Sequence, residues 1–332
     1  MSVQLPTYKR LMLFSGTASP SLAEEIAEHL GMKLGRVEIE TFSNSESYAR
    51  FADSVRGQDA FVIQSMCEPV DHHVMQQLIM IDALKRASAK RITAVCPLYP
   101  YSRQDRKARG REPITAKLIA DMYEAAGVNR MVSVDLHSGQ IQGFSNVPFD
   151  HLTALPLLAG YFADRLEDDF VIVSPDAGGV HLADKWVRHL DEFHGLSGQV
   201  AFLHKRRRKD LRNQSETLGP VVGEVRGKVC VIVDDIIDTA GSLTQAVEVL
   251  LDAGAEDVYA AATHPVLSDP AVDRIKNSPL EQVVVTNTLP IESDQQLDNL
   301  CVLSIAPTIA QTIKAVFEEE SVSELFYGEN QP

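Results

Sequence analysis

The fold is decided by residues 229–242, which read Val-Cys-Val-Ile-Val-Asp-Asp-Ile-Ile-Asp-Thr-Ala-Gly-Ser. The first five of these residues are apolar and mostly β-branched, which predicts a strand buried on both faces, as is usual in a parallel sheet. Asp234 and Asp235 end this strand, and an acidic turn with hydroxyl groups follows. Residues 243–251 then have the apolar spacing of a helix. The stretch therefore predicts a strand, a loop and a helix within an α/β protein.

The loop at 238–242 has the features of a phosphate site. Beyond the carboxyl end of a strand, free backbone N–H groups and the positive end of a helix dipole converge, and Thr239 and Ser242 add hydroxyl donors. Asp234 and Asp235 are too acidic to help hold a phosphate, but paired acceptors suit the vicinal hydroxyls of a sugar. Together these features indicate a site for ribose 5-phosphate. The alternative is a surface turn with a capping Asp, which the intact spacing disfavours.

Length and composition limit the classes of partner. At 332 residues the chain is too long for one ordinary core, so two domains are expected. A net charge of −15 argues against a nucleic-acid partner. The four cysteines are far apart and form no Cys-x-x-Cys pair, and no signal peptide or membrane-spanning run is evident. We therefore expect a cytoplasmic protein with reduced core cysteines and no membrane partner.

The rest of the chain alternates predicted strands and helices. In the first half we expect strands at 11–14, 37–42, 60–65, 91–99 and 131–136, with helices at 20–30, 71–89 and 113–127. A second set begins after about residue 152, with strands near 170–174, 199–203, 229–233, 257–263 and 282–287 and helices between them. Residues 306–320 are predicted to form a last helix that packs on the first domain. This alternation predicts parallel sheets with crossover helices.

Residues 101–107 leave a predicted strand at its carboxyl end, where ligands bind in parallel sheets. Arg103 is a candidate phosphate donor, and Gln104 and Asp105 could contact the edge of a base. A solvated run of charges is an equally good interpretation of this stretch taken alone.

Two further strand ends carry candidate metal ligands. His137 follows a predicted strand, although a lone histidine is more often a structural donor than a ligand. Asp176 also follows a buried strand and precedes Gly178 and Gly179, which let the backbone approach an anion closely. Together His137 and Asp176 could hold a Mg²⁺ that screens a triphosphate, because Mg²⁺ takes few protein ligands and keeps water and phosphate oxygens.

Residues 205–209, Lys-Arg-Arg-Arg-Lys, are the strongest local positive charge in this acidic chain. The polar stretch at 210–217 that follows has no apolar periodicity, which predicts a long loop. A nucleic-acid patch is the alternative, which the net charge disfavours. A mobile cationic flap that closes over a polyphosphate transition state is the favoured hypothesis.

These motifs resemble those of the ribose-phosphate pyrophosphokinase family. The spacing Asp-Asp-x-x-Asp-Thr-x-Gly-Ser at 234–242 is similar to the phosphoribosyl-diphosphate motif of that family and of type I phosphoribosyltransferases. Further stretches that look like the pyrophosphokinases are 101–107, 111–118, 135–137, 140–144, 174–176 and 321–323. The phosphoribosyltransferases share only the first motif and are commonly shorter, so the resemblance, which covers nearly the whole chain, favours the pyrophosphokinases.

The resemblance implies the reaction and the architecture. The family transfers the β,γ-diphosphoryl group of Mg²⁺-bound ATP to the anomeric hydroxyl of ribose 5-phosphate, which gives 5-phosphoribosyl 1-diphosphate and AMP. It implies an α/β fold of two tandem phosphoribosyltransferase-like (type I) domains, each a mostly parallel sheet flanked by helices. The ATP-side domain would comprise residues 8–152 and the C-terminal helix 308–328, and the ribose 5-phosphate side would comprise 153–307. It also implies a homohexamer that is built from dimers. Inorganic phosphate would activate this enzyme and ADP would inhibit it. The alternatives are a type I phosphoribosyltransferase and a catalytically inactive regulatory homologue.

The resemblance also assigns roles to individual residues. The catalytic-loop cations are Lys205 and Arg207, and the expected ATP contacts are Phe42, Asn44, Glu46, Arg103, Gln104 and Asp105. The metal contacts are His137 and Asp176, and the diphosphate loop comprises Asp176, Ala177, Gly178 and Gly179. The ribose hydroxyls are assigned to Asp234 and Asp235, and the 5-phosphate to Asp238, Thr239, Ala240, Gly241 and Ser242. The regulatory residues are Ser54, Arg56, Ser321 and Ser323. Two positions depart from the usual family pattern: Asn44 replaces an Asp, and Glu324 stands where many members have Tyr.

Overall fold

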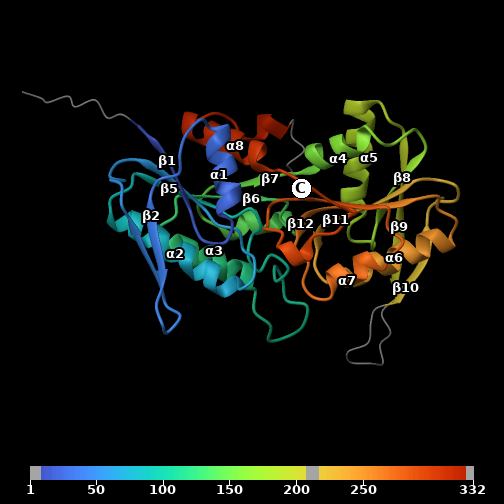
Figure 1. Cartoon of the computed structure of the whole chain (residues 1–332), viewed down its shortest axis with the longest axis horizontal. Coiled ribbons are helices and arrows are strands. Elements are labelled where there is room, and N and C mark those ends of the chain that lie inside the picture. The colour runs from blue at the N-terminus through green and yellow to red at the C-terminus, as the bar shows by residue number, and fades with distance from the viewer. Residues whose placement is uncertain (1–8, 207–216, 327–332) are drawn as a thin grey trace, which may run out of the picture. The chain divides into compact units, whose positions relative to one another are not determined.

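The computed structural model of the chain describes residues 9–206 and 217–326. The chain divides into two compact units. Unit 1 comprises Met1–Thr153, Thr288–Pro290 and Ala306–Pro332, and unit 2 comprises Ala154–Asn287 and Ile291–Ile305. Each unit contains its own sheet with helices packed on it (Figure 1). The predicted fold class, α/β with mostly parallel sheets flanked by helices, is confirmed.

Unit 1 is built on a five-stranded sheet in the order β1-β4-β5-β6-β7, in which every pair is parallel. The strands are β1 (Leu11–Ser15), β4 (Asp59–Ile63), β5 (Arg91–Val95), β6 (Arg130–Val134) and β7 (Phe149–Leu152). The helices are α1 (Pro20–His29), α2 (Val70–Arg86), α3 (Thr115–Ala126) and α8 (Ala306–Glu318). Helix α1 packs against α8, and α2 packs against α3, on opposite faces of the sheet (Figure 1).

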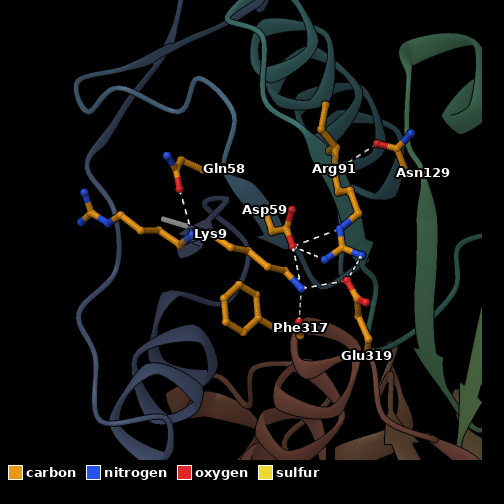
Figure 2. A network of polar contacts seen from close by, with 9 residues as sticks. Lys9, Gln58, Asp59, Arg91, Asn129, Phe317 and Glu319 are labelled. Carbon is orange, nitrogen blue, oxygen red and sulfur yellow. Dashed lines mark hydrogen bonds and ion pairs between the residues drawn. The ribbon is translucent and has the colours of Figure 1, made fainter. Parts of the chain in front are cut away.

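A separate antiparallel hairpin, β2 (Val37–Thr41) and β3 (Ser47–Phe51), packs against α2 through β3. Two short 3₁₀ helices, η1 (Gly139–Phe144) and η3 (Ser323–Phe326), complete the described part of the unit. The end of α8 is joined to the sheet by a polar network around Asp59, the first residue of β4 (Figure 2). This network connects the two ends of the chain, because Lys9 and Glu319 both take part in it.

Unit 2 has a seven-stranded sheet in the order β10-β9-β8-β11-β12-β13-β14. The strands are β8 (Phe170–Ser174), β9 (Gly198–Arg206), β10 (Thr217–Val222), β11 (Cys230–Ile237), β12 (Val258–Pro265), β13 (Gln282–Thr286) and β14 (Leu300–Leu303). Only the edge strand β10 is antiparallel to its neighbour. The helices are α4 (Leu155–Ala163), α5 (Val180–His194), α6 (Gly241–Asp252) and α7 (Ala271–Lys276), with a 3₁₀ turn η2 (Ser293–Gln295).

The predicted central strand lies in the middle of this sheet. β11 pairs with β8 on one side and β12 on the other, and Cys230 to Val233 are buried. Burial raises the pKa of the Cys230 thiol to about 12, so this cysteine is an inert core residue. Cys96 is also buried, whereas Cys67 and Cys301 are only half-buried, so the prediction of core cysteines holds for two of the four.

Two strands of unit 2 extend past their predicted ends. β11 continues through Asp234 and Asp235 to Ile237, because Ile236 and Ile237 still pair with β12. The prediction that the strand ends in the two carboxylates is therefore wrong, because two more residues of β11 follow them. β9 likewise runs to Arg206, so Lys205 belongs to a strand and not to the following loop.

Among the described residues, no helix combines the length and the apolar character that a membrane crossing requires.

Candidate active site

The order of the strands in unit 2 indicates where a ligand binds. After β8 the chain passes through α5 to β9 on one side, whereas after β11 it passes through α6 to β12 on the other side. Because β8 and β11 are neighbours, the connections diverge between their carboxyl ends, and ligands of open α/β sheets bind at such a point. Three predicted site segments meet this edge of the sheet: 176–179 after β8, 234–235 in β11 and 238–242 after it.

The 238–242 loop is short and has a defined shape. It joins the end of β11 at Ile237 to the start of α6 at Gly241. Ala240 adopts the left-handed conformation (φ 56°), which turns the chain into the helix. The backbone N–H and the hydroxyl of Thr244 donate to the Ala240 carbonyl at 3.0 and 3.1 Å, which closes the first turn. Arg274 of α7, which the sequence analysis did not single out, donates from Nη1 to the Thr239 carbonyl at 2.8 Å.

Asp234 and Asp235 form an acidic pair near this loop. The Asp235 N–H donates to Asp234 Oδ1 at 2.9 Å. The Asp234 side chain is reached by solvent, yet protein atoms surround it densely. This desolvation, followed by the negative charges of Asp235 and Asp176, raises the pKa of the Asp234 carboxyl above its ordinary value. The three carboxylates therefore repel one another, and a bound cation or a hydrogen-bond donor would relieve that repulsion.

The 176–179 loop has a tight internal structure. Asp176 Oδ1 accepts hydrogen bonds from the N–H groups of Gly178 at 2.8 Å and Gly179 at 3.3 Å. Ser174 Oγ donates to the Asp176 carbonyl at 2.6 Å. A Cβ atom on Gly179 would lie 2.6 Å from Ser174 Oγ, so a larger residue does not fit without a shift. The carboxylate that was predicted to serve a metal therefore also fixes its own loop at the start of α5.

The predicted catalytic cations fall partly outside the structure. Lys205 lies near the end of β9, which is parallel to β8, so its backbone lies at the same carboxyl edge of the sheet. It is paired with Leu218 of β10. Arg207 lies outside the described residues. The catalytic role of both residues stays a prediction.

In unit 1, the 101–105 segment is held against the start of α3. Tyr101 has a left-handed backbone (φ 57°), and its hydroxyl donates to Asp71. Thr115 Oγ1 donates to Gln104 Oε1 at 2.6 Å, so the acceptor of this side chain is already engaged. Arg103 is exposed and Asp105 half-buried. Among the three predicted ATP contacts in this segment, Gln104 therefore also has a structural function, because it binds the first residue of α3.

The tip of the β2–β3 hairpin carries the other predicted ATP contacts. Phe42 is 48% exposed and its ring lies 5.9 Å from that of Tyr48, which is 41% exposed. Asn44 Oδ1 accepts a hydrogen bond from the Glu46 N–H at 3.2 Å, and Phe42 N–H donates to the Glu46 carbonyl at 2.8 Å. The Asn44 acceptor therefore stabilises the turn, while the aromatic pair stands on the surface.

The remaining predicted residues are exposed. His137 follows β6 in unit 1, whereas Asp176 belongs to unit 2, so the metal site they were predicted to share stays a prediction. Ser321 and Ser323 contact each other through their hydroxyls at 3.1 Å, and Ser54 and Arg56 lie on the loop after β3. Within the described ranges, no three His, Cys, Asp or Glu side chains cluster closely enough to hold a metal ion.

Comparisons with known proteins identify the family. The family described as the N-terminal domain of ribose phosphate pyrophosphokinase matches residues 11–127, and the phosphoribosyl synthetase-associated domain matches residues 211–327. The chain is 52% identical over 319 residues to the ribose-phosphate pyrophosphokinase of Streptomyces coelicolor, with 96% of each chain covered. It is 52% identical over 322 residues to that of Mycobacterium tuberculosis strain H37Rv, with 97% of each covered.

A solved structure gives the same result. The phosphoribosylpyrophosphate synthetase of Mycobacterium smegmatis superposes with a TM-score of 0.86 at 51% identity, which covers 94% of this chain and 100% of that one. The family predicted from the motifs is thereby confirmed. The chain belongs to the ribose-phosphate pyrophosphokinase family, whose members are enzymes that transfer a diphosphoryl group.

Proposed function

We propose that this enzyme transfers the β,γ-diphosphoryl group of ATP to the anomeric hydroxyl of ribose 5-phosphate, which gives 5-phosphoribosyl 1-diphosphate and AMP. The observation that carries the proposal is the edge of the unit 2 sheet between β8 and β11. There a helix-starting loop at 238–242, a pair of carboxylates and a glycine loop at 176–179 gather at a topological switch point. Each of these parts suits one portion of the sugar phosphate product.

In this proposal the 238–242 loop binds the 5-phosphate through backbone N–H groups and the hydroxyls of Thr239 and Ser242. Asp234 and Asp235 accept hydrogen bonds from the two ribose hydroxyls, because charged acceptors bind a diol strongly. The 176–179 loop and the start of α5 would face the diphosphoryl group being transferred. To bind it, the N–H groups of Gly178 and Gly179 would have to exchange their hydrogen bonds to Asp176 Oδ1 for bonds to phosphate oxygens. The sugar would then be held at both ends.

We propose that Mg²⁺ accompanies ATP at this edge, bound mainly by phosphate oxygens and water, because Mg²⁺ takes few protein ligands. Desolvation and, after it, the negative charges of Asp235 and Asp176 raise the pKa of Asp234, and a nearby cation would offset those charges. Bound Mg²⁺ would neutralise charge on the phosphate oxygens. His137 of unit 1 and Asp176 of unit 2 are the residues we propose for the metal bound with ATP.

We propose that unit 1 supplies the ATP site. Phe42 would stack on adenine, with Asn44 and Glu46 beside it, and Arg103, Gln104 and Asp105 would contact the nucleotide. Catalysis needs no nucleophilic side chain, because the sugar hydroxyl attacks phosphorus in line and the protein aligns the groups. Lys205 and Arg207 would stabilise negative charge on the transferred group. Arginine cannot act as a general base, because its guanidinium stays protonated.

The reaction is tested by incubating the protein with ATP, Mg²⁺ and ribose 5-phosphate and measuring AMP. A phosphoribosyltransferase would instead release diphosphate from 5-phosphoribosyl 1-diphosphate when given a base, and an inactive homologue would do neither. We expect Lys205→Ala to lower kcat at least about 1,000-fold while ribose 5-phosphate still binds. Lys276→Ala, an exposed lysine of the same unit, is the control. Weaker binding with an unchanged kcat would make Lys205 a docking residue only.

We further propose a homohexamer that is built from dimers, in which the 42–46 turn completes the ATP site of a neighbouring subunit. The exposed aromatic pair at the hairpin tip supports this proposal. Inactive Glu46→Ala and Lys205→Ala chains that are dissociated and reassembled together should then regain about a quarter of the sites, one half times one half. No recovery in proven mixed oligomers would place the site within one chain.

We propose regulation by inorganic phosphate and ADP at Ser54, Arg56, Ser321 and Ser323. The two serines near the C-terminus already touch each other, and Arg56 is an exposed cation that could pair with an anion. We also propose that the enzyme works in the cytoplasm, a reducing compartment in which its four cysteines would stay as thiols.

A further inference from the structure

Arg274 is an exposed residue of the short helix α7, yet buried residues of the same helix fix its position. Ala271 and Ile275 on the same helix are fully buried and belong to the core of unit 2. The backbone N–H of Leu267 donates to the carbonyl of Ile237 at 3.0 Å, which ties the segment before α7 to the end of β11. Helix α7 also packs against α6, which the 238–242 loop precedes. The base of the Arg274 side chain is thereby held beside this loop.

The guanidinium of Arg274 reaches the backbone of the loop. Nη1 donates to the Thr239 carbonyl at 2.8 Å, and it would lie only 3.0 Å from a Cβ atom built on Gly241. No carboxylate in the described part of unit 2 forms an ion pair with Arg274, so its charge is not neutralised there. A cationic hydrogen-bond donor from α7 thus contacts the loop, in addition to the contacts that the loop makes with the start of α6.

The direction of one peptide group follows from this contact. In a trans peptide the C=O and the N–H point in opposite directions, so fixing the Thr239 carbonyl also fixes the Ala240 N–H. Ala240 has φ 56°, a conformation that residues other than glycine seldom adopt without support from their surroundings. If the 239–240 peptide turned over, it would present a carbonyl oxygen where a phosphate needs a donor.

We propose that Arg274 is a positioning residue for the phosphate of the sugar substrate. It holds the 239–240 peptide so that the loop presents N–H groups to the 5-phosphate, and its charge favours an anion beside the acidic pair Asp234 and Asp235. This inference rests on the proposed function, because it takes 238–242 as the 5-phosphate loop. It adds a contribution from α7 to a site otherwise built from β8 and β11 and the segments that follow them.

The test compares Arg274→Met, which removes the donor, with Arg274→Lys, which keeps a charged donor. Lys276→Met on the same helix is the matched control, because Lys276 is also exposed and, within the described residues, has no contact with the loop. Binding of ribose 5-phosphate alone is measured by calorimetric titration, and AMP release gives kcat and the KM of each substrate. Thermal unfolding checks that each variant is folded.

For Arg274→Met we expect ribose 5-phosphate to bind about 10- to 100-fold more weakly, because this is the loss of affinity expected when one charge-assisted hydrogen bond is removed. The KM for ribose 5-phosphate should rise by the same factor, while kcat at saturation and the KM for ATP change less than about twofold. Arg274→Lys should recover most of the affinity. Lys276→Met should match the wild type within about twofold.

Two results would overturn the inference: equal affinity of Arg274→Met and the wild type, or a loss of kcat and melting temperature that Arg274→Lys shares in full. The second result would make Arg274 a structural residue only. If the wild type bound ribose 5-phosphate but released no AMP, the proposed reaction would be wrong and the titration would still decide the role of Arg274. Failure of the wild type to bind ribose 5-phosphate would overturn both.

Discussion

Asp59 of unit 1 and Asp234 of unit 2 are carboxylates on inner strands of parallel sheets, but they lie toward opposite strand ends. Asp59 is the first residue of β4, and Asp234 is the fifth residue of β11. The side chain of Asp59 is 3% exposed, and two cations surround it (Figure 2). Asp234 is reached by solvent and has two other carboxylates as its charged neighbours.

The charge of Asp59 is compensated within the protein. Arg91 donates to Asp59 Oδ2 from Nε at 3.0 Å and also from Nη2, and Lys9 Nζ lies 3.7 Å from the same oxygen. The hydrogen bond to Asp59 raises the pKa of the Arg91 guanidinium. Lys9 also donates to the Phe317 carbonyl and lies 4.6 Å from the centroid of the Phe317 ring. The network thus fastens the end of α8 to β1, β4 and β5.

The difference separates a structural carboxylate from a binding carboxylate. Around Asp59 the fold has supplied the counter-charges on Oδ2, so removing this carboxylate would leave Arg91 and Lys9 without their shared acceptor. Around Asp234 the fold has supplied more negative charge, which costs stability until a donor or a cation arrives. Removing the first carboxylate should therefore harm folding, and removing the second should harm binding.

The largest expected effect is on binding. Asp234→Ala combined with Asp235→Ala should weaken ribose 5-phosphate binding about 1,000-fold, because two charged acceptors are lost from a diol. ATP affinity should change less than about threefold. Calorimetric titration with each ligand measures both, and Asp252→Ala, an exposed acid on α6, is the control. Equal losses for both ligands would contradict the assignment of the pair to the sugar.

The next effect is on stability. Asp59→Ala should lower the free energy of unfolding by about 3 kcal/mol, because it leaves Arg91 and Lys9 partly buried without their shared acceptor. Ribose 5-phosphate affinity should stay within about twofold of the wild type. Urea unfolding followed by circular dichroism measures the change. Asp82→Ala breaks an exposed pair with Arg86 and should have little effect. A similar loss in both variants would mean that the buried network has no special role.

A smaller effect of opposite sign is expected at Asp234. Its pKa is raised in the folded protein, so its stability contribution is greatest at low pH and falls as the pH rises above the ordinary Asp value through the folded pKa. At neutral pH, Asp234→Asn should therefore raise the melting temperature of the ligand-free protein by about 2–4 °C, although it impairs binding. The gain should shrink as the pH falls toward about 4. Scanning calorimetry from pH 4 to 8 checks this, with Asp252→Asn as control; a lower melting temperature at neutral pH would refute it.

The sequence predicted the inner strands of both sheets because these strands are buried on both faces and form apolar runs. β3, β7, β10 and β14 were not predicted. β7, β10 and β14 are sheet edges and β3 belongs to a hairpin, and their partial exposure removes that pattern. The end of β11 was missed for another reason. Its carboxylates indicated a loop, but pairing of Ile236 with His264 carries the strand past them.

The candidate site was predictable where it depends on local sequence. The 176–179 and 238–242 loops each follow a buried strand and carry residues with an evident chemical use. Arg274 was not predictable, because it reaches Thr239 across 35 positions and a lone arginine in a short helix gives no signal. The turn function of Asn44 and the Thr115 contact of Gln104 were hidden too, since both depend on how the chain folds back.

The smallest expected effect concerns Glu319, the exposed member of the Asp59 network, which contacts Lys9 at 3.2 Å and Arg91 at 3.4 Å across more than 200 positions. The hydrogen bond from Lys9, together with the charges of Lys9 and Arg91, lowers the pKa of this carboxyl. Its contribution to stability is therefore present above the ordinary Glu value and is lost as the pH falls through the lowered folded pKa. Glu319→Gln should lower the melting temperature by no more than about 2 °C at neutral pH and low salt, because exposed ion pairs contribute little.

The difference between Glu319→Gln and the wild type should vanish in about 0.5 M salt, which screens exposed charges. It should vanish again in acid, once the pH has fallen through the lowered pKa of Glu319. Asp59→Ala should keep most of its effect in the same salt, because Asp59 is shielded from solvent. Melting curves of both variants at two salt concentrations make the comparison. If salt reduced the two effects equally, Asp59 would behave as a surface charge, and the contrast with Asp234 would rest on the neighbouring charges alone.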